Sequence, residues 1–227
     1  MTTIGCIGSG RVGATVARLA VDAGHDVVLS NSRGPQTLAE LVAELGPRAR
    51  ASTPAEAAAA GDIVVVAVPF AVYRSVPVAP LAGTVVIDAC NYYPQRDGWV
   101  PELQSGASTS SELLQRHLPE ARVVKVFNNI YFRHLGELPR PSGAVDRSAL
   151  AIAGDDEGAR AAVTAFLDAI GYDTVDVGPL AEGWRFQPGT PAFATLYGDG
   201  PVWQTAASRP VSVDELTSLL AAAGRRP

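Results

Sequence analysis

Three glycines near the N-terminus have the spacing of a dinucleotide-binding turn. The segment Gly8-Ser9-Gly10-Arg11-Val12-Gly13 follows a short apolar run, Ile4 to Ile7, and precedes a helical pattern. In such a turn the first glycine allows a tight bend, the second lets the backbone approach a pyrophosphate, and the third lets helix and strand pack closely. The helix that begins there also offers backbone N–H groups and the positive end of its dipole to phosphates. The motif therefore predicts dinucleotide binding, and a turn that serves packing alone is the alternative.

The segment after the second apolar run bears on which nicotinamide cofactor is bound. An NAD site typically has a carboxylate about 20 residues after the glycines, where it binds the ribose hydroxyls. This chain has Asn31, Ser32 and Arg33 at that place and no carboxylate. An arginine beside small hydrogen-bonding residues suits the 2′-phosphate of NADP. The pattern favours NADP(H) over NAD, and a solvated loop arginine is the alternative.

Amides and aromatic rings follow the strands of the predicted sheet. All four asparagines, Asn31, Asn91, Asn128 and Asn129, fall at or just beyond the carboxyl ends of predicted strands, where ligands of open α/β sheets bind. An amide can pair with ribose hydroxyls or a carboxamide, although turns and helix caps also use asparagine. Aromatic groups follow the fourth, fifth and sixth predicted strands: Phe70 with Tyr73, Tyr92 with Tyr93 and Trp99, and Phe127 with Tyr131 and Phe132. Such rings can wall a flat ligand or simply fill the core. The predicted acceptor site comprises Phe70, Tyr92, Asn128, Asn129, Trp184 and Trp203.

Several catalytic signatures are missing from the sequence. The Tyr-x-x-x-Lys pair of short-chain dehydrogenases would need a tyrosine four residues before the only lysine, Lys125, and Ala121 stands there. No Gly-x-Ser-x-Gly elbow, His-Glu-x-x-His segment or cysteine cluster occurs, so we predict neither a hydrolase nor a metal site. No histidine has an evident partner, and no catalytic acid is assigned. This favours hydride transfer to an acceptor that needs little proton assistance from the protein.

The elements that would position these residues alternate along the chain. Strands are predicted at 4–7, 26–30, near 50, 63–68, 85–88, 123–127, 149–153 and 174–177, and helices at 11–23, 37–45, 53 onward, 111–118 and 157–170. Such alternation predicts an α/β fold of the Rossmann type, with a doubly wound, mostly parallel sheet.

The C-terminal part of the sequence has a different character. Residues 1–177 are predicted to form the NADP-binding Rossmann domain, and residues 178–227 a small aromatic-rich appendix that acts as a lid, a dimer surface or both. The stretch from Pro188 to Pro201 is too rich in glycine and proline for a continuous helix. It must therefore bury its aromatic rings against the domain or a second subunit. We expect truncation after Pro179 to leave NADPH binding largely intact, to abolish hydride transfer and to shift the protein toward monomer.

Composition limits the other classes of partner. The 227 residues carry a formal net charge of -5, and only 18% of them are charged. The basic residues are scattered, so neither nucleic acid nor an anionic membrane is an expected partner. No apolar stretch approaches the roughly 18 residues of a membrane span, and the first residues lack the basic start of a signal peptide. We therefore expect a cytoplasmic protein.

Six short segments occur in the order found in one enzyme family. These are Ile4–Gly13, Ala23–His25, Asn31–Arg33, Val68–Pro69, Lys125–Asn128 and Asp176–Leu180. Together they resemble the NADPH-dependent reductases of the deazaflavin coenzyme F420, over about residues 3 to 180. The resemblance implies a Rossmann domain that binds NADP, a deazaflavin stacked on the nicotinamide, and a homodimer.

The resemblance also implies roles for individual residues. Ser9, Arg11 and Val12 would line the pyrophosphate, Ser32 and Arg33 the 2′-phosphate, and Val68, Pro69 and Asn91 the nicotinamide. One departure concerns the position after the arginine, where family members often have a second basic residue and this chain has Gly34 followed by Pro35. Hydride transfer between NADPH and a deazaflavin is the leading prediction. The alternatives are an NADPH-dependent reductase of a small imine or carbonyl compound and a non-catalytic NADP-binding sensor.

Overall fold

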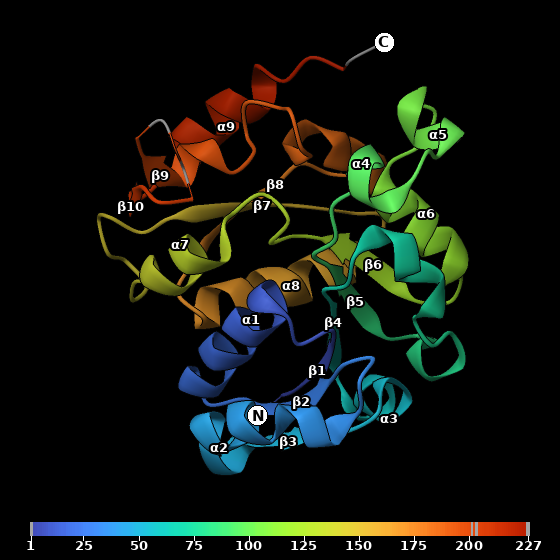
Figure 1. Cartoon of the computed structure of the whole chain (residues 1–227). Coiled ribbons are helices and arrows are strands. Elements are labelled where there is room, and N and C mark those ends of the chain that lie inside the picture. The colour runs from blue at the N-terminus through green and yellow to red at the C-terminus, as the bar shows by residue number, and fades with distance from the viewer. Residues whose placement is uncertain (1, 201, 203, 226–227) are drawn as a thin grey trace.

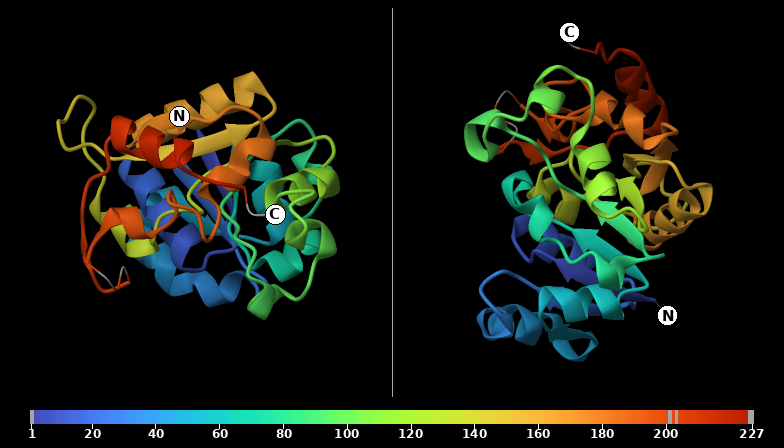
Figure 2. Two further views of the ribbon diagram at one scale, coloured as in Figure 1. Left: turned by 90° about the horizontal axis from the view of Figure 1, so that it is seen from above. Right: turned by 90° about the vertical axis from the view of Figure 1, so that its right-hand side faces the viewer.

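An eight-stranded sheet runs through the middle of the molecule, with helices on both of its faces (Figures 1 and 2). The computed structural model describes residues 2–200, 202 and 204–225. The strand order is β3-β2-β1-β4-β5-β6-β7-β8. The pairs from β3 to β6 are parallel, β7 is antiparallel to β6, and β8 is parallel to β7. The predicted Rossmann-type fold with a mostly parallel sheet is confirmed.

The observed bounds of the main strands and longer helices agree closely with those predicted from the periodicity of the sequence. The strands are β1 (Thr3–Ile7), β2 (Asp26–Ser30), β3 (Ala49–Ala51), β4 (Ile63–Val66), β5 (Val85–Asp88), β6 (Arg122–Lys125), β7 (Ala149–Gly154) and β8 (Asp173–Asp176), with a small hairpin of β9 (Gly198–Asp199) and β10 (Ala207–Ser208). The helices are α1 (Arg11–Asp22), α2 (Ala39–Leu45), α3 (Pro54–Ala60), α4 (Pro94–Asp97), α5 (Pro101–Gln104), α6 (Ser110–His117), α7 (Phe132–Glu137), α8 (Glu157–Ala169) and α9 (Val213–Ala221).

The sheet has a separate apolar core on each face. Successive residues of a strand point to opposite faces, so Val65 joins the core beneath α1 and α8 while Val64 and Val66 join the core beneath α3 and α6. Strands buried on both sides need an almost continuous apolar sequence, as β4 has. Burying each valine side chain contributes about 1.5–3 kcal/mol. The two cores fix the carboxyl ends of the parallel strands at one edge.

The C-terminal residues belong to the larger of these cores. Phe186, Tyr197 and Leu216 are completely buried and pack with residues of α1, α8 and the strands. The Tyr197 hydroxyl donates to the Ala149 carbonyl at 2.8 Å, and the Ala149 N–H donates to Val211 at 2.8 Å. Truncation after Pro179 would remove these groups and expose β7, so our expectation that such a variant still binds NADPH must be revised. The boundary at Val177 remains a prediction.

A capping box begins α3, which then packs on β1. The Thr53 hydroxyl accepts from the Glu56 N–H, while the Glu56 carboxylate accepts from Ser52, from the Thr53 N–H and from the Thr53 hydroxyl. Hydrogen bonds from Ser52 first and Thr53 second lower the pKa of Glu56 to about 2. The helix then packs closely on β1, where a Cβ on Gly5 would lie 2.3 Å from the Ala57 carbonyl oxygen.

We expect the Glu56→Gln substitution to lower the melting temperature in a pH-dependent way. The folded-state pKa of Glu56, about 2, lies below its ordinary value of 4.5, so the ionised carboxylate stabilises the fold above pH 4.5. That contribution is lost as pH falls through the folded-state pKa. Thermal melts of both proteins should differ at pH 7 and converge near pH 2. A difference that is independent of pH would contradict this role.

None of the helices in the described ranges has both the length and the apolar character needed to cross a membrane.

Candidate functional site

The glycine turn between β1 and α1 has the geometry that its spacing predicts. Gly8 has a φ of +99°, a conformation that L side chains rarely adopt. A Cβ on Gly13 would lie 1.9 Å from the Gly8 carbonyl oxygen, so only glycine allows the helix to pack on the turn. A Cβ on Gly10 would meet no protein atom within 4 Å. Gly10 therefore borders open space at the start of α1, as close approach of a ligand to the backbone requires.

The first turn of α1 is suited to an anion. Gly10 is its N-cap, no side chain caps the helix, and no acidic residue lies in the first turn. The Arg11 guanidinium lies 5.2 Å from the centre of the Phe132 ring and pairs with no carboxylate in the described part of the chain. The helix dipole and Arg11 thus present positive charge next to Gly10.

The loop after β2 presents Arg33 to solvent. Asn31 shapes this loop, because its Oδ1 accepts from the Arg33 N–H at 2.9 Å and its Nδ2 donates to Thr37 at 2.8 Å. Asn31 therefore has the turn-forming role that was the alternative to direct ligand binding. The Arg33 guanidinium has no hydrogen-bonding or ionic partner among residues 2–200, 202 and 204–225. Gly34 has a φ of +94°, which explains why a second basic side chain is disfavoured at that position.

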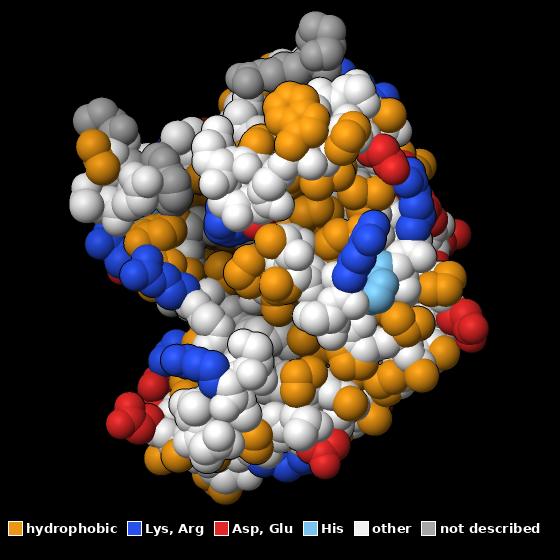
Figure 3. All heavy atoms as spheres, turned by 45° about the vertical axis from the view of Figure 1, so that its right-hand side comes forward, with side chains coloured by type: hydrophobic (Ala, Val, Ile, Leu, Met, Phe, Trp, Pro, Cys, Tyr) orange, Lys and Arg blue, Asp and Glu red, His pale blue; other side chains and the backbone are white. Residues whose placement is uncertain are grey.

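A cleft of about 390 Å³ extends from the glycine turn across the strand ends. Its walls come from the turn, from the segments after β4, β5 and β6, and from the C-terminal region, which reaches it at Phe193 and Ala194. Figure 3 shows this side of the molecule hollowed, with hydrophobic side chains inside the hollow. The predicted site residues that line the cleft are Gly10, Arg11, Val12, Val68, Pro69, Asn91 and Asn128.

Aromatic rings line the cleft, and four of the five belong to the aromatic groups predicted after β5 and β6, but they are not the residues singled out for the acceptor site. The rings present are those of Tyr93, Phe127, Tyr131, Phe132 and Phe193. The sequence indicates aromatic groups after β5 and β6 without showing which member of each group faces the ligand.

The predicted aromatic residues have other environments. Phe70 is buried and stacks on Tyr73 at 4.6 Å between ring centres, so it belongs to the core. Tyr92 and Trp184 line a neighbouring groove of about 280 Å³ instead of the cleft. The Tyr92 hydroxyl is already used, since it donates to Gly98 and accepts from Val100 and Gln104. Trp203 lies outside the described residues.

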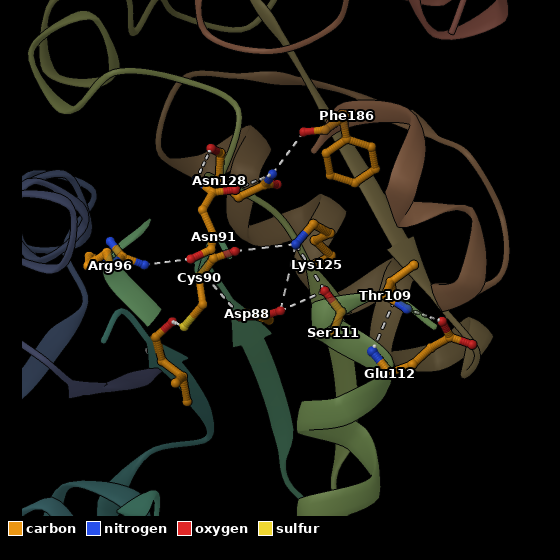
Figure 4. Close-up of polar contacts among 11 residues, drawn as sticks. Asp88, Cys90, Asn91, Arg96, Thr109, Ser111, Glu112, Lys125, Asn128 and Phe186 are labelled. Atoms are coloured by element: carbon orange, nitrogen blue, oxygen red, sulfur yellow. Dashed lines mark hydrogen bonds and ion pairs between the residues drawn. The ribbon is translucent and has the colours of Figure 1, made fainter. Parts of the chain in front are cut away.

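Two of the predicted asparagines connect the sheet to the C-terminal region. Asn91 Nδ2 donates to the Asn128 carbonyl at 2.7 Å, and Asn128 Nδ2 donates to Asn91 Oδ1 at 3.2 Å and to the Phe186 carbonyl at 2.8 Å (Figure 4). Asn129 is completely buried and donates to Ala192 at 3.0 Å, so its placement in the acceptor site is wrong. The side chains of Asn128 and Asn129 thus point in different directions. Asn129 holds the segment at Ala192, which continues into the cleft wall at Phe193 and Ala194.

Backbone strain is concentrated at the same place. Phe127, with a φ of 66°, and Ala194, with a φ of 54°, are the non-glycine residues with positive φ in the described chain. Both line the cleft, and the Ala194 N–H donates to the Asn129 carbonyl at 2.8 Å. Such conformations cost of order 1–3 kcal/mol each and persist where the surroundings enforce them. The cleft walls are therefore held in a specific shape.

A buried ion pair lies directly behind the cleft wall. Lys125 Nζ is 3.8 Å from Asp88 Oδ2, and both side chains are 1% exposed. Ser111 donates to Asp88 at 2.6 Å, Lys125 donates to Ser111 and to the Cys90 carbonyl, and the Cys90 N–H donates to Asp88 (Figure 4). Burial first, and the Asp88 charge second, raise the pKa of the Cys90 thiol well above its usual range. This network fixes the backbone that leads to Asn91.

One charged residue of the cleft was not predicted. Arg96 lines it, and Arg96 Nε and Nη2 each donate to a different oxygen of Asp97 at 2.8 Å. Burial opposes ionisation of Asp97, but hydrogen bonds from Arg96 and from the N–H groups of Tyr93 and Ala71 outweigh it and lower the pKa of Asp97. The hydrophobic pattern of the sequence does not indicate that this Arg-Asp pair borders a site. The only local signal is Pro94, which is typical of a helix start and does begin α4.

Comparison with known proteins supports this interpretation of the glycine turn. Residues 3–92 match the model of one family, described as NADP oxidoreductase, coenzyme F420-dependent. The resemblance expected from the sequence is thereby confirmed for that part of the chain. Residues 3–92 form a Rossmann domain of the NAD(P)-binding oxidoreductases. No curated protein matches the chain.

Solved structures extend the likeness over most of the chain. A hypothetical protein from Sinorhizobium meliloti is 29% identical with a TM-score of 0.74, and the match covers 86% of this chain and 94% of that one. A protein from Arthrobacter sp. FB24, described provisionally as an F420-dependent NADP reductase, is 28% identical with a TM-score of 0.67, over 79% and 86% of the two chains. A reductive aminase from Aspergillus terreus, at 18% identity and a TM-score of 0.56 over 80% and 56% of the chains, shares the fold.

Proposed function

We propose that this protein transfers a hydride between NADPH and a deazaflavin of the coenzyme F420 type. The observation that carries the proposal is the cleft itself, which begins at the glycine turn and is walled by aromatic rings. Its volume of about 390 Å³ lies within the usual range of small-molecule sites. A flat tricyclic ring could lie between such walls. The family matched by residues 3–92 has the same pair of ligands in its description.

The positively charged groups suggest how the phosphates of the cofactor would be placed. The pyrophosphate would lie on Gly10 and the first turn of α1, beside Arg11, and the 2′-phosphate would bind Arg33. The nicotinamide would then reach the strand ends, between Val68, Pro69 and Asn91. This arrangement leaves the aromatic part of the cleft for the hydride acceptor.

The side chains that line the cleft favour an acceptor that needs little acid catalysis. In the part of the chain that the structure describes, these side chains include no aspartate, glutamate or histidine, and the hydroxyl groups are those of Tyr93 and Tyr131. Burial raises the pKa of Tyr93, which makes its phenol a weaker proton donor than an exposed tyrosine. Reduction of an imine or ketone is assisted by a proton donor placed at the reacting atom. A deazaflavin spreads the incoming charge over a conjugated ring, which makes it the better match.

We expect Arg33→Ala to weaken NADPH binding and leave NADH binding unchanged. Loss of a charge-assisted contact to the 2′-phosphate should cost about 1.5–3 kcal/mol, or roughly tenfold to a hundredfold in Kd. Titration of both cofactors by protein fluorescence measures the effect. Arg50→Ala, which removes an exposed arginine of β3, is the matched control. Equal binding of NADPH and NADH by the wild type would overturn the preference for NADP.

Stopped-flow absorbance with NADPH and oxidised coenzyme F420 tests the function directly. The proposal predicts that the visible band of the deazaflavin disappears over many turnovers at catalytic enzyme concentrations. A protein that binds NADPH but leaves the deazaflavin oxidised would contradict it. Consumption of NADPH by a small imine or ketone would then indicate the rival reductase, and the absence of any turnover would indicate an NADP-binding sensor.

A further inference from the structure

We propose that Arg96 binds the hydride acceptor, through an acceptor oxygen that carries negative charge or gains it as the hydride arrives. The inference rests on the proposed function and names a specificity-determining residue for it. It assigns to the acceptor a conjugated carbonyl or ionised hydroxyl group at the end of the ring that faces Arg96. The steps below establish that Arg96 is rigid, that one edge of its guanidinium is open toward the cleft, and that no carboxylate among the described lining residues faces that edge.

Arg96 is held from behind by groups that the fold provides. Arg96 Nε and Nη2 make two parallel N–H···O contacts to Asp97. Arg96 Nη2 also donates to the Asn91 carbonyl at 2.6 Å, the contact drawn in Figure 4. The Asp97 side chain is fully buried and accepts two more hydrogen bonds, from the N–H groups of Tyr93 and Ala71. Parallel hydrogen bonds of this kind fix the plane as well as the position of a guanidinium. Arg96 is therefore preorganised without a ligand.

The opposite edge of the guanidinium is open. The Arg96 side chain is 46% exposed, lines the cleft, and has no partner at Nη1 in the described part of the chain. Its plane lies over the Tyr93 ring, with Cζ 5.0 Å from the ring centre. A ligand oxygen at this end of the cleft would thus find Nη1 free to donate a hydrogen bond.

The two positively charged side chains of the cleft lie at separate places along it. Among the described residues, its lining contains two cations, Arg11 and Arg96, and no carboxylate. Arg11 is in the first turn of α1, where the pyrophosphate is proposed to bind. Arg96 comes from α4, beyond Asn91 and the nicotinamide position. A cofactor bound in this way would pair with Arg11 and leave the open edge of the Arg96 guanidinium for the acceptor.

This position suits the electron flow of the proposed reaction. The C–H bond at C4 of the dihydronicotinamide breaks, and its electron pair forms a new C–H bond at an electron-poor carbon of the acceptor ring. The displaced π pair moves along the conjugated system to a terminal oxygen or nitrogen, which takes up a proton from water. The products are the oxidised nicotinamide and the dihydro acceptor. A guanidinium at the terminal oxygen stabilises the charge that develops there.

Binding in a complex that cannot react tests the inference. Oxidised coenzyme F420 is titrated by its own fluorescence into protein saturated with NADP⁺, so neither ligand can supply a hydride. For Arg96→Gln we expect the Kd of the deazaflavin to rise roughly tenfold to a hundredfold, while the Kd of NADP⁺ changes by less than about twofold. Arg74→Gln is the matched control, because Arg74 also lies over a tyrosine, Tyr73, but outside the cleft.

Further variants separate recognition from folding. Arg96→Gln leaves the buried Asp97 without its cation, so the double variant Arg96→Gln, Asp97→Asn removes that unpaired charge and should show the same loss of deazaflavin binding. Arg96→Lys should restore part of the affinity. Unchanged deazaflavin binding in both Gln variants, or equal weakening of both ligands, would overturn the inference alone. A wild-type protein that does not bind the deazaflavin would refute the proposed function and the inference with it.

Discussion

The Gly10→Ala variant should fold normally and lose most of its affinity for NADPH. In the free protein the added Cβ meets no atom within 4 Å, and Gly10 has a φ of −77°, which alanine adopts readily. The unfolding free energy should therefore change by less than about 1 kcal/mol. A bound pyrophosphate would occupy the space that the methyl group takes. The overlap should cost about 3 kcal/mol, or roughly a hundredfold in Kd.

Gly13→Ala provides the contrasting control for this prediction. Its Cβ would lie 1.9 Å from the Gly8 carbonyl oxygen in the absence of any ligand, so this variant should lose stability as well as binding. Urea unfolding and NADPH titration of both variants distinguish a ligand contact from a packing contact. Normal NADPH binding by a folded Gly10→Ala protein would show that the cofactor does not approach this backbone.

The Lys125→Met variant should lose a large part of the stability of the fold. Methionine approximates the length of the lysine stem, so packing against Gly183 is retained, but the buried Asp88 side chain loses its cationic partner. Removing one partner of a buried ion pair typically costs about 3–5 kcal/mol, from a total stability of about 5–15 kcal/mol. Urea unfolding measures the loss.

Two comparisons show whether the loss comes from the buried charge. Arg122→Met, on the same strand, removes a surface pair in which both side chains are more than two-fifths exposed, and should cost less than about 1 kcal/mol. Adding Asp88→Asn to Lys125→Met removes the unpaired charge and should recover much of the stability. A single Lys125→Met variant as stable as the wild type would refute the role of this network.

Periodicity and turn chemistry were enough to predict most of the fold. The alternation of apolar strands with helices fixes the layers, and the glycine spacing places the turn that begins α1. The reversal of direction between β6 and β7 was not predicted, because α7 lies at the end of β6 and does not return along the sheet. Helices α4 and α5 were missed as well, since four residues are too few to show a helical period.

The part of the cleft next to the glycine turn was easier to predict than the part walled by aromatic rings. Gly10, Arg11 and Val68 follow from the positions of turns and strand ends, which are local properties of the sequence. Which aromatic residue faces the cleft depends on packing that the sequence does not show. Phe70 turns into the core, whereas Tyr93 turns toward the cleft. Asn128 and Asn129 are adjacent and identical in type, yet only Asn128 borders the cleft.

Transfer of an isotopic label tests the central claim most directly. NADPH carrying deuterium at C4 is prepared in both stereochemical forms, and each is incubated with the protein and oxidised coenzyme F420. Direct hydride transfer predicts that one form, and only one, passes its deuterium to the deazaflavin, raising the mass of the reduced product by one unit. Reduced deazaflavin without deuterium from either form, or no reduction in the presence of bound NADPH, would contradict the account.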